Sequence, residues 1–282
     1  MTFIDYDDFI NDGSMPFTSF WDEKDLQSFL ESFYDLVKMQ SQKLGLELNS
    51  NTNDFHEQLD HMVLQLNNAD PAALDFVTSM LIITKAAKKI ASNDNFLHIT
   101  SDILGSPKER LLIDGPTILI NLPQNKTRLY TWHAESHWYP KRRNFLNTWS
   151  PLIRPKTKEN GTMYVARKSH KQKWDFSEFY GFDKDSVDDS SYFLQYEIPD
   201  EEIKNLEKIP VEINPTDLYV FHQDCVHAAS VNTSDTISYS MIMKVFDFTK
   251  DLTLSANQGE RPYRYTPKDV ATGRPRLKPA TY

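Results

Sequence analysis

The sequence predicts an α+β fold, in which a helical first third is followed by an antiparallel β region. Two observations support this fold class. Before about residue 110, apolar residues recur with the period of an amphipathic helix. After residue 110, the apolar runs shorten to strand length, and Pro, Gly, Asn and Asp separate them. No internal repeat is present, so we expect a single domain over residues 1–282, with a mainly helical part (1–110), a β core (111–250) and a C-terminal tail (251–282).

Three helices are predicted in the helical part. The first begins near Ser19, a candidate N-cap, and its buried stripe is formed by Leu26, Phe29, Leu30, Phe33 and Val37. The second has the same spacing in Phe55, Leu59, Met62, Val63 and Leu66. The third covers residues 70–90, with Pro71 in its first turn, where a missing backbone N–H is tolerated.

The β core contains eight segments with the length and composition of strands. In chain order they are TILINLP (117–123), RLYTWHAES (128–136), LNTWSPLI (146–153), GTMYVAR (161–167), FLQYEIP (193–199), EKIPVEI (207–213), DLYVFH (217–222) and TISYSMIMKVF (236–246). The tail from Asn257 is rich in Pro and Arg and lacks apolar periodicity. We expect the tail to wrap the surface or to be partly disordered.

Composition excludes several classes of protein. A net charge of −9 argues against a general nucleic-acid binder. The single cysteine, Cys225, excludes a disulfide framework and a Cys-rich zinc site within one chain. The acidic start MTFIDYDDFINDG is not a secretory signal, and the most apolar run, FVTSMLIITKAAKKIA, is too short and too basic to span a bilayer. We therefore expect a soluble cytoplasmic protein without membrane or nucleic-acid partners, whose oligomeric state the sequence does not indicate.

The densest chemistry lies in TWHAESHWYP, residues 131–140. In a strand, residues two apart share a face, so His133 and Glu135 would point to one place. A third ligand is expected from His227, at the end of a later strand. Two histidines and one carboxylate, with open positions left on the metal, are the ligand pattern of non-heme Fe(II) oxygenases. Alone, an H-x-[DE] triplet is common by chance, and a hydrogen-bonded surface or core histidine is the competing interpretation.

Several further motifs accompany this triplet. In order they are TWHAES, NTWSPLI, KENGTMYVARKSHK and PTDLYVFHQDCVHAASVNTS, spread over about residues 115–246. With them the sequence resembles the phytanoyl-CoA dioxygenase-like family of Fe(II)/2-oxoglutarate oxygenases. The resemblance implies a double-stranded β-helix, or distorted jelly roll, with the helical region packed on it. It also implies an enzyme, a dioxygenase that hydroxylates an unactivated C–H bond with Fe(II), 2-oxoglutarate and O₂, and His133, Glu135 and His227 as metal ligands.

Two details refine the metal site that the resemblance implies. A halogenating relative would lack the carboxylate ligand, so Glu135 favours oxygen insertion. His222, in HQD, is a competing histidine near His227. The family places its distal histidine before an Asn-x-Ser turn, which here follows His227, so we expect His222 to be only a strand-end neighbour of the site.

The expected arginine for 2-oxoglutarate is missing. Family members usually hold its far carboxylate with an Arg at the position of Ser238. Arg154 and Lys244 are the candidate replacements, and Arg154 ranks first because its planar fork fits a carboxylate and because Lys244 lies roughly 20 Å along the strand from Ser238. Ser240, which can donate a hydrogen bond, and Trp149 complete the expected co-substrate set. The missing Arg also leaves open a metalloenzyme on the same fold that does not use 2-oxoglutarate.

A positive island lies close to the metal-binding segment. Between Lys141 and Lys173 there are ten Lys or Arg residues and one acid, Glu159. A solvated loop face is the usual role of such a run, but beside an active site it would attract an anion. We expect a small anionic substrate (a sugar acid, a sugar phosphate or nucleotide sugar, or an acyl-CoA), bound by Lys141, Arg142, Arg143, Trp138 and Tyr139. A non-catalytic ligand-binding jelly roll is the remaining alternative.

Overall fold

The computed structural model describes residues 6–47, 52–126, 129–137, 144–172, 198–250, 263–264 and 278–279. The described α-helices are α1 (Asp7–Asp12), α2 (Glu23–Lys43), α3 (Phe55–Ala69), α4 (Pro71–Leu81), α5 (Lys85–Ala91), α6 (Asp94–Leu104) and α7 (Asp200–Ile203). The described strands are β1 (Ser14–Phe17), β2 (Leu111–Asn121), β3 (Phe145–Pro151), β4 (Met163–Ala166), β5 (Lys208–Pro210), β6 (Leu218–His222), β7 (His227–Ala229), β8 (Ser238–Asp247), β9 (Tyr263–Arg264) and β10 (Lys278–Pro279).

The predicted apolar stripes of the first two helices are buried, which confirms them. In α2, all five predicted stripe residues are buried, and in α3 four of the five are buried while Phe55 is partly exposed. The predicted start of the first helix at Ser19 is wrong. The N-cap is Asp22, whose side chain accepts a hydrogen bond from the Lys24 N–H. The Ser19 N–H instead donates to the Asp217 carboxylate, which ties this segment to the turn before β6.

The predicted helix over residues 70–90 is two helices, α4 and α5. Pro71 is at the start of α4, as expected. The chain breaks after Leu81 because Thr84 leaves the helix and caps α5, its hydroxyl accepting from the Ala87 N–H. Another helix, α6, follows Asn93, whose side chain accepts from the Phe96 N–H, and ends at Gly105 in a left-handed conformation.

Two antiparallel sheets form the β core. The large sheet has the strand order β1-β6-β3-β8-β2, and the small sheet has the order β5-β4-β7. β1 comes from the N-terminal part, which was expected to be helical, and pairs with β6. The expected strand over 128–136 is also wrong, because Glu135–His137 is a 3₁₀ turn. Most of the expected strand at 193–199 lies outside the described residues, as does nearly all of the 251–282 tail.

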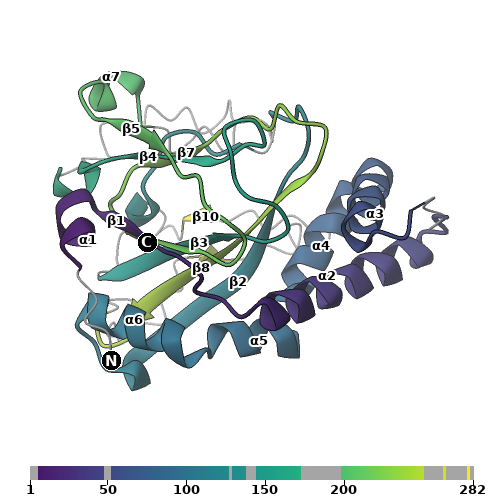
Figure 1. The fold of residues 1–282 in the computed structure, drawn as a ribbon, viewed down its shortest axis with the longest axis horizontal. Helices are drawn as coiled ribbons and strands as arrows, with labels where there is room; N and C mark the ends of the chain where they lie inside the picture. Colours follow the sequence, from purple (N-terminus) through teal and green to yellow (C-terminus); the bar gives the residue numbers. More distant parts are fainter. Residues whose placement is uncertain are drawn as a thin grey trace.

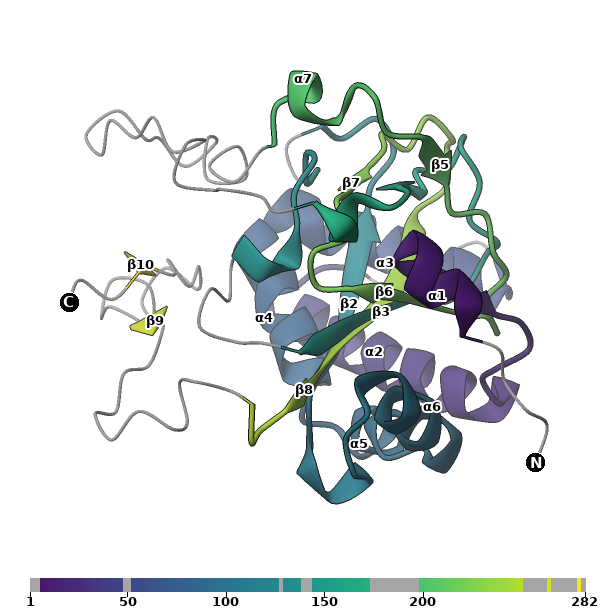
Figure 2. The same cartoon turned by 90° about the vertical axis from the view of Figure 1, so that its left-hand side faces the viewer.

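The large sheet separates two layers. In Figure 1 the small sheet lies above it, and helices α2 to α6 lie along its lower and right-hand sides; Figure 2 shows α2, α5 and α6 below the sheet and β5 and β7 above it. Alternation along β8 explains this arrangement. One face joins the core shared with the helices, through Tyr239, Met241, Met243 and Val245. The other face looks toward the small sheet, where Ile242 packs against a cluster that includes Trp149, Val165 and Phe221.

This architecture is a distorted jelly roll with helices packed on the outer face of the large sheet, as the resemblance implied. Between the two sheets, buried polar residues of β8 lie on the same face of the large sheet as an apolar cluster. Polar side chains in such a buried setting are candidates for a functional site. Among the described residues, no helix has both the length and the apolar character needed to cross a bilayer.

Candidate metal centre

His133, Glu135 and His227 form a compact group of donors between the two sheets. One donor atom from each residue lies within 4.8 Å of the other two. Both histidines are buried, and the Glu135 side chain is 15% exposed. Nε2 of each histidine lies 3.8 or 3.9 Å from Oε1 of Glu135, within the roughly 4.4 Å that two metal–ligand bonds of about 2.2 Å can span. Two imidazoles and a carboxylate are also the donor set that suits non-heme iron.

The backbone brings the two histidines together. His133 and His227 form an isolated antiparallel bridge, in which each N–H donates to the other residue's carbonyl at 3.0 and 2.9 Å. After His133 the chain turns, and the Ser136 N–H donates to the Gln223 carbonyl. Glu135 therefore reaches the histidines from a turn. The side chains meet as expected, although the strand alternation offered as the reason is wrong.

Both imidazoles are held so that Nε2 faces the group. Nδ1 of His133 lies 2.6 Å from the Thr131 carbonyl, and Nδ1 of His227 lies 3.0 Å from the Cys225 carbonyl. A carbonyl oxygen can only accept, so each Nδ1 carries the proton and each Nε2 keeps its lone pair. The two Nε2 atoms lie 3.8 and 3.9 Å from Oε1 of Glu135. Backbone contacts of this kind fix the tautomer and ring orientation of metal-ligating histidines.

The electrostatics favour the protonation states that a metal ligand needs. Burial and the neighbouring His133 lower the pKa of His227 to about 3, so its ring is neutral near pH 7. Burial alone would raise the pKa of Glu135, but Lys244 and the two histidines hold it well below its usual range. Nζ of Lys244 lies 3.3 Å from Oε2 of Glu135. The carboxylate is therefore ionised, and one of its oxygens faces the imidazoles.

His222 does not belong to this group. It is the last residue of β6, and its Nδ1 lies 3.7 Å from the Asp224 carboxylate. Its ring lies near that of His170, with centroids 5.6 Å apart and the ring planes tilted by 53°. Among the described residues, the only group of three or more candidate metal-binding side chains is the one formed with His227.

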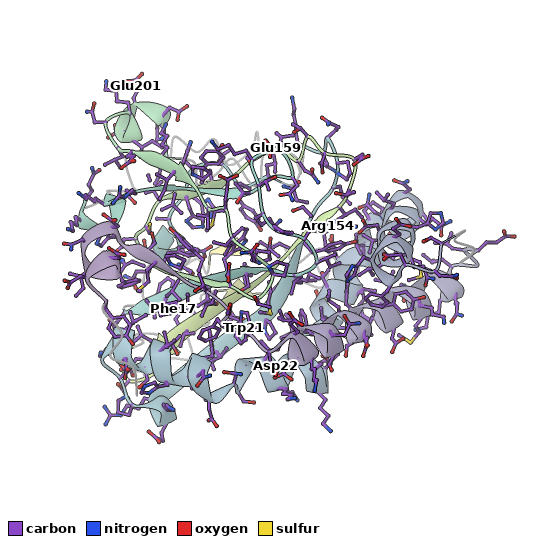
Figure 3. All side chains as sticks on the ribbon, viewed as in Figure 1. Phe17, Trp21, Asp22, Arg154, Glu159 and Glu201 are labelled. Carbon is purple, nitrogen blue, oxygen red and sulfur yellow. The ribbon has the colours of Figure 1, made fainter. Side chains whose placement is uncertain are left out.

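The residues expected to bind the co-substrate lie in three different places. Ser238, Ser240 and Trp149 are buried on strands of the large sheet, β8 and β3. Lys244 lies at Glu135 and not at Ser238. Arg154 is occupied on the helical side, where its guanidinium lies 2.8 Å from the Asp60 carboxylate of α3 and donates to the Ile237 carbonyl at 3.0 Å. Figure 3 shows Arg154 on the side of the molecule where α3 lies.

The residue that sequence reasoning missed is Lys156. Its side chain is 2% exposed, and its Nζ donates a hydrogen bond to Oγ of Ser238, the position where the resemblance leads one to expect an Arg. Nζ also lies 5.7 Å from the centre of the Trp149 ring. Lys156 was counted within the positive island, but nothing in the sequence distinguishes an inward lysine from its exposed neighbour Lys158.

Asn147 is a second residue that the sequence did not single out. It is 3% exposed, and neither polar atom of its amide has a hydrogen-bond partner among the residues that the structure describes. It lies opposite Lys244 in the register of β3 and β8. A buried amide without a partner is costly, so this position suits a contact with a bound molecule. The available signal was a polar residue two positions before Trp149, on the same face of a predicted strand.

The expected substrate-binding residues Trp138, Tyr139, Lys141, Arg142 and Arg143 lie outside the described residues. Elsewhere in the positive island, acidic partners offset part of the charge. Arg167 forms ion pairs with Asp12 and Glu207, and Arg154 pairs with Asp60.

Comparisons with known proteins bear on the family and on the fold. A family model described as phytanoyl-CoA dioxygenase matches residues 9–238, which is most of the chain. Comparison with curated proteins gives no match.

Solved structures of similar fold include several non-heme enzymes. The epimerase SnoN, in complex with Fe³⁺, α-ketoglutarate and nogalamycin RO, is 15% identical with a TM-score of 0.54, covering 92% of this chain and 91% of SnoN. EvdO2 from Micromonospora carbonacea var. aurantiaca, complexed with 2-oxoglutarate, is 16% identical with a TM-score of 0.52, covering 87% and 91%. EctD from S. alaskensis is 11% identical with a TM-score of 0.55, covering 86% and 76%. At these identities, the similarity shows a shared fold.

Proposed function

The chain belongs to the phytanoyl-CoA dioxygenase family, and on that premise we propose that it hydroxylates an unactivated C–H bond of a small anionic substrate, with His133, Glu135 and His227 as its iron ligands. The family consists of Fe(II)/2-oxoglutarate-dependent oxygenases, so the protein is an enzyme of this type with these two cofactors.

The observation that carries the proposal is the convergence of two Nε2 atoms and one carboxylate oxygen at a buried point. Three protein ligands leave open positions on a six-coordinate iron, as a reaction with a co-substrate and O₂ requires. Each histidine is oriented by a backbone carbonyl, so the donors are pre-positioned before any ion binds.

When bound, iron with 2-oxoglutarate and O₂ supplies the oxidising power that C–H hydroxylation needs. The protein holds the donors and excludes water. Phe221 packs against His227, with ring centroids 4.7 Å apart. The same apolar cluster includes Trp149, Met163 and Val165, drawn from both sheets. These side chains keep one side of the donor group dry, which strengthens electrostatic interactions within it.

The anionic substrate class rests on charge. The run Lys141–Arg143 follows the Glu135–His137 turn within six residues, so it is close in sequence to the proposed ligand Glu135. A field of one sign near a site raises the local concentration of ligands of the opposite sign. Sugar acids, sugar phosphates, nucleotide sugars and acyl-CoA thioesters share this charge, and each offers unactivated C–H bonds.

The test is metal loading followed by co-substrate turnover. Anaerobic titration of Fe(II) should give about one equivalent bound to the wild type, with most of it lost in His133→Ala, Glu135→Ala and His227→Ala. His222→Ala is the matched control and should keep its iron. In air, the iron-loaded wild type should form succinate from 2-oxoglutarate. Full iron occupancy in all three variants would contradict the assigned ligands, and absence of succinate would contradict the turnover.

A further inference from the structure

Lys156 is a buried cation without a buried anion. Its side chain is 2% exposed. Within the part of the chain that the structure describes, no carboxylate lies at ion-pair distance from it, and its polar contacts are the Ser238 hydroxyl and the face of Trp149. A hydroxyl and an aromatic ring offset only part of the cost of removing an ammonium group from water. This environment therefore suits an anion that arrives from outside the protein.

The position of Lys156 relates it to the donor group. Ser238 lies on the same face of β8 as Lys244, which contacts Glu135. Trp149, beneath the Lys156 ammonium, shares an apolar cluster with Phe221. Phe221 in turn contacts the ring of His227. The cation and the metal donors therefore border one interior between the sheets, with apolar side chains along the wall that connects them.

We propose that Lys156 binds the far carboxylate of 2-oxoglutarate, with Ser238 holding the ammonium in place. This inference rests on the proposed function, because the other end of the co-substrate would bind the iron held by His133, Glu135 and His227. Ser238 also explains why a lysine can serve here. A short side chain at this position leaves room for the Lys156 ammonium, which an arginine would fill.

The other two candidate cations are already engaged. Arg154 is paired with Asp60, and its contact with the Ile237 carbonyl holds it toward the helices. Lys244 is paired with Glu135, at the metal end of β8. Of these three cations, Lys156 alone has no acidic partner among the described residues, and it is also the one that contacts Ser238.

The test compares two keto acids on protein loaded with Mn(II), which supports binding without turnover. 2-Oxoglutarate carries the far carboxylate, whereas 2-oxobutyrate keeps the chelating keto-acid end and lacks it. In Lys156→Met, affinity for 2-oxoglutarate should fall at least about tenfold, as expected for losing a charge-assisted hydrogen bond in a buried site. Affinity for 2-oxobutyrate should stay unchanged, and Lys156→Arg should recover part of the loss. Lys158→Met is the matched control, since Lys158 is exposed two residues away.

The possible results distinguish a failure of the Lys156 proposal from a failure of the proposed metal site. Lys156→Met that binds 2-oxoglutarate as tightly as the wild type overturns the proposal. An equal loss for both keto acids also overturns it, because that result indicates a structural role. Failure of the wild type to bind Mn(II) would instead contradict the proposed metal site. Thermal unfolding checks that Lys156→Met is folded, and Lys156→Gln provides a second, polar variant with the same expected result.

Discussion

Lys244 and Glu135 form an ion pair that links the large sheet to the turn carrying the carboxylate, with Nζ 3.3 Å from Oε2. The lysine approaches one carboxylate oxygen, while the other oxygen faces the two imidazoles. Lys244 is thus a cation that offsets the charge of Glu135. A divalent ion at the histidines would contribute the same offset from the opposite side.

Replacing Lys244 by Met should therefore destabilise the metal-free protein more than the metal-loaded protein. Breaking a buried pair leaves an uncompensated carboxylate, so we expect a loss of up to about 3 kcal/mol in the free energy of unfolding. Saturating Mn(II) should recover much of this loss. Denaturation with and without Mn(II) measures both effects. Lys204→Met, which removes an exposed pair with Glu201, is the control and should change little. Equal losses with and without metal would contradict the expectation.

The stability of the metal-free protein should depend on pH through Lys156. Burial lowers the pKa of Lys156 from 10.5 to about 7. Between these values the unfolded chain binds more protons than the folded chain, so stability rises with pH, by up to about 1.4 kcal/mol per pH unit. Below pH 7 this group adds no further dependence, because it is protonated in both states. Denaturation of wild type and Lys156→Met from pH 7 to 10 should show the rise only in the wild type; parallel curves would exclude Lys156 as its source.

Arg154→Ala should affect stability and leave 2-oxoglutarate binding intact. The substitution removes the partner of Asp60, whose pKa is raised by burial and lowered by Arg154. We expect a loss of about 1–3 kcal/mol from the unpaired carboxylate and the lost hydrogen bond to Ile237. A double-mutant cycle with Asp60→Ala isolates the pair. A clear drop in 2-oxoglutarate affinity in Arg154→Ala would restore Arg154 as the carboxylate partner that the sequence ranked first.

The run Lys141–Arg143 should act at long range on anionic ligands. Neutralising all three residues with Gln should weaken binding of coenzyme A, used as a polyanionic probe, more at low salt than at high salt, because screening already suppresses exposed charges. The control is the triple Gln variant of Lys158, Lys168 and Lys171, which are exposed members of the same positive island. Equal effects of the two triple variants would show that the run has no special position relative to the site.

Local patterns in the sequence determined much of the fold. The stripe of α2 and the Pro71 start of α4 follow from helical periodicity and from local backbone chemistry, so they could be predicted. The strand pattern after residue 110 indicated the jelly roll only together with the motif order. The start of α2 was misplaced because Ser19 and Asp22 are both good caps, and the contact of Ser19 with Asp217, distant in sequence, decides between them.

For the site, the residue types and the motif order were enough to predict His133, Glu135 and His227 as the donor group, and the structure places their side chains together. Only the tertiary structure decided how they meet, through a turn at Glu135 and a bridge between the histidines. The tertiary structure also decided which group each basic residue contacts. Arg154 pairs with Asp60 of α3, Lys244 pairs with Glu135, and Lys156 donates a hydrogen bond to Ser238. Their sequence positions look alike, because desolvation and ion pairing depend on the residues that long-range packing brings around each charge.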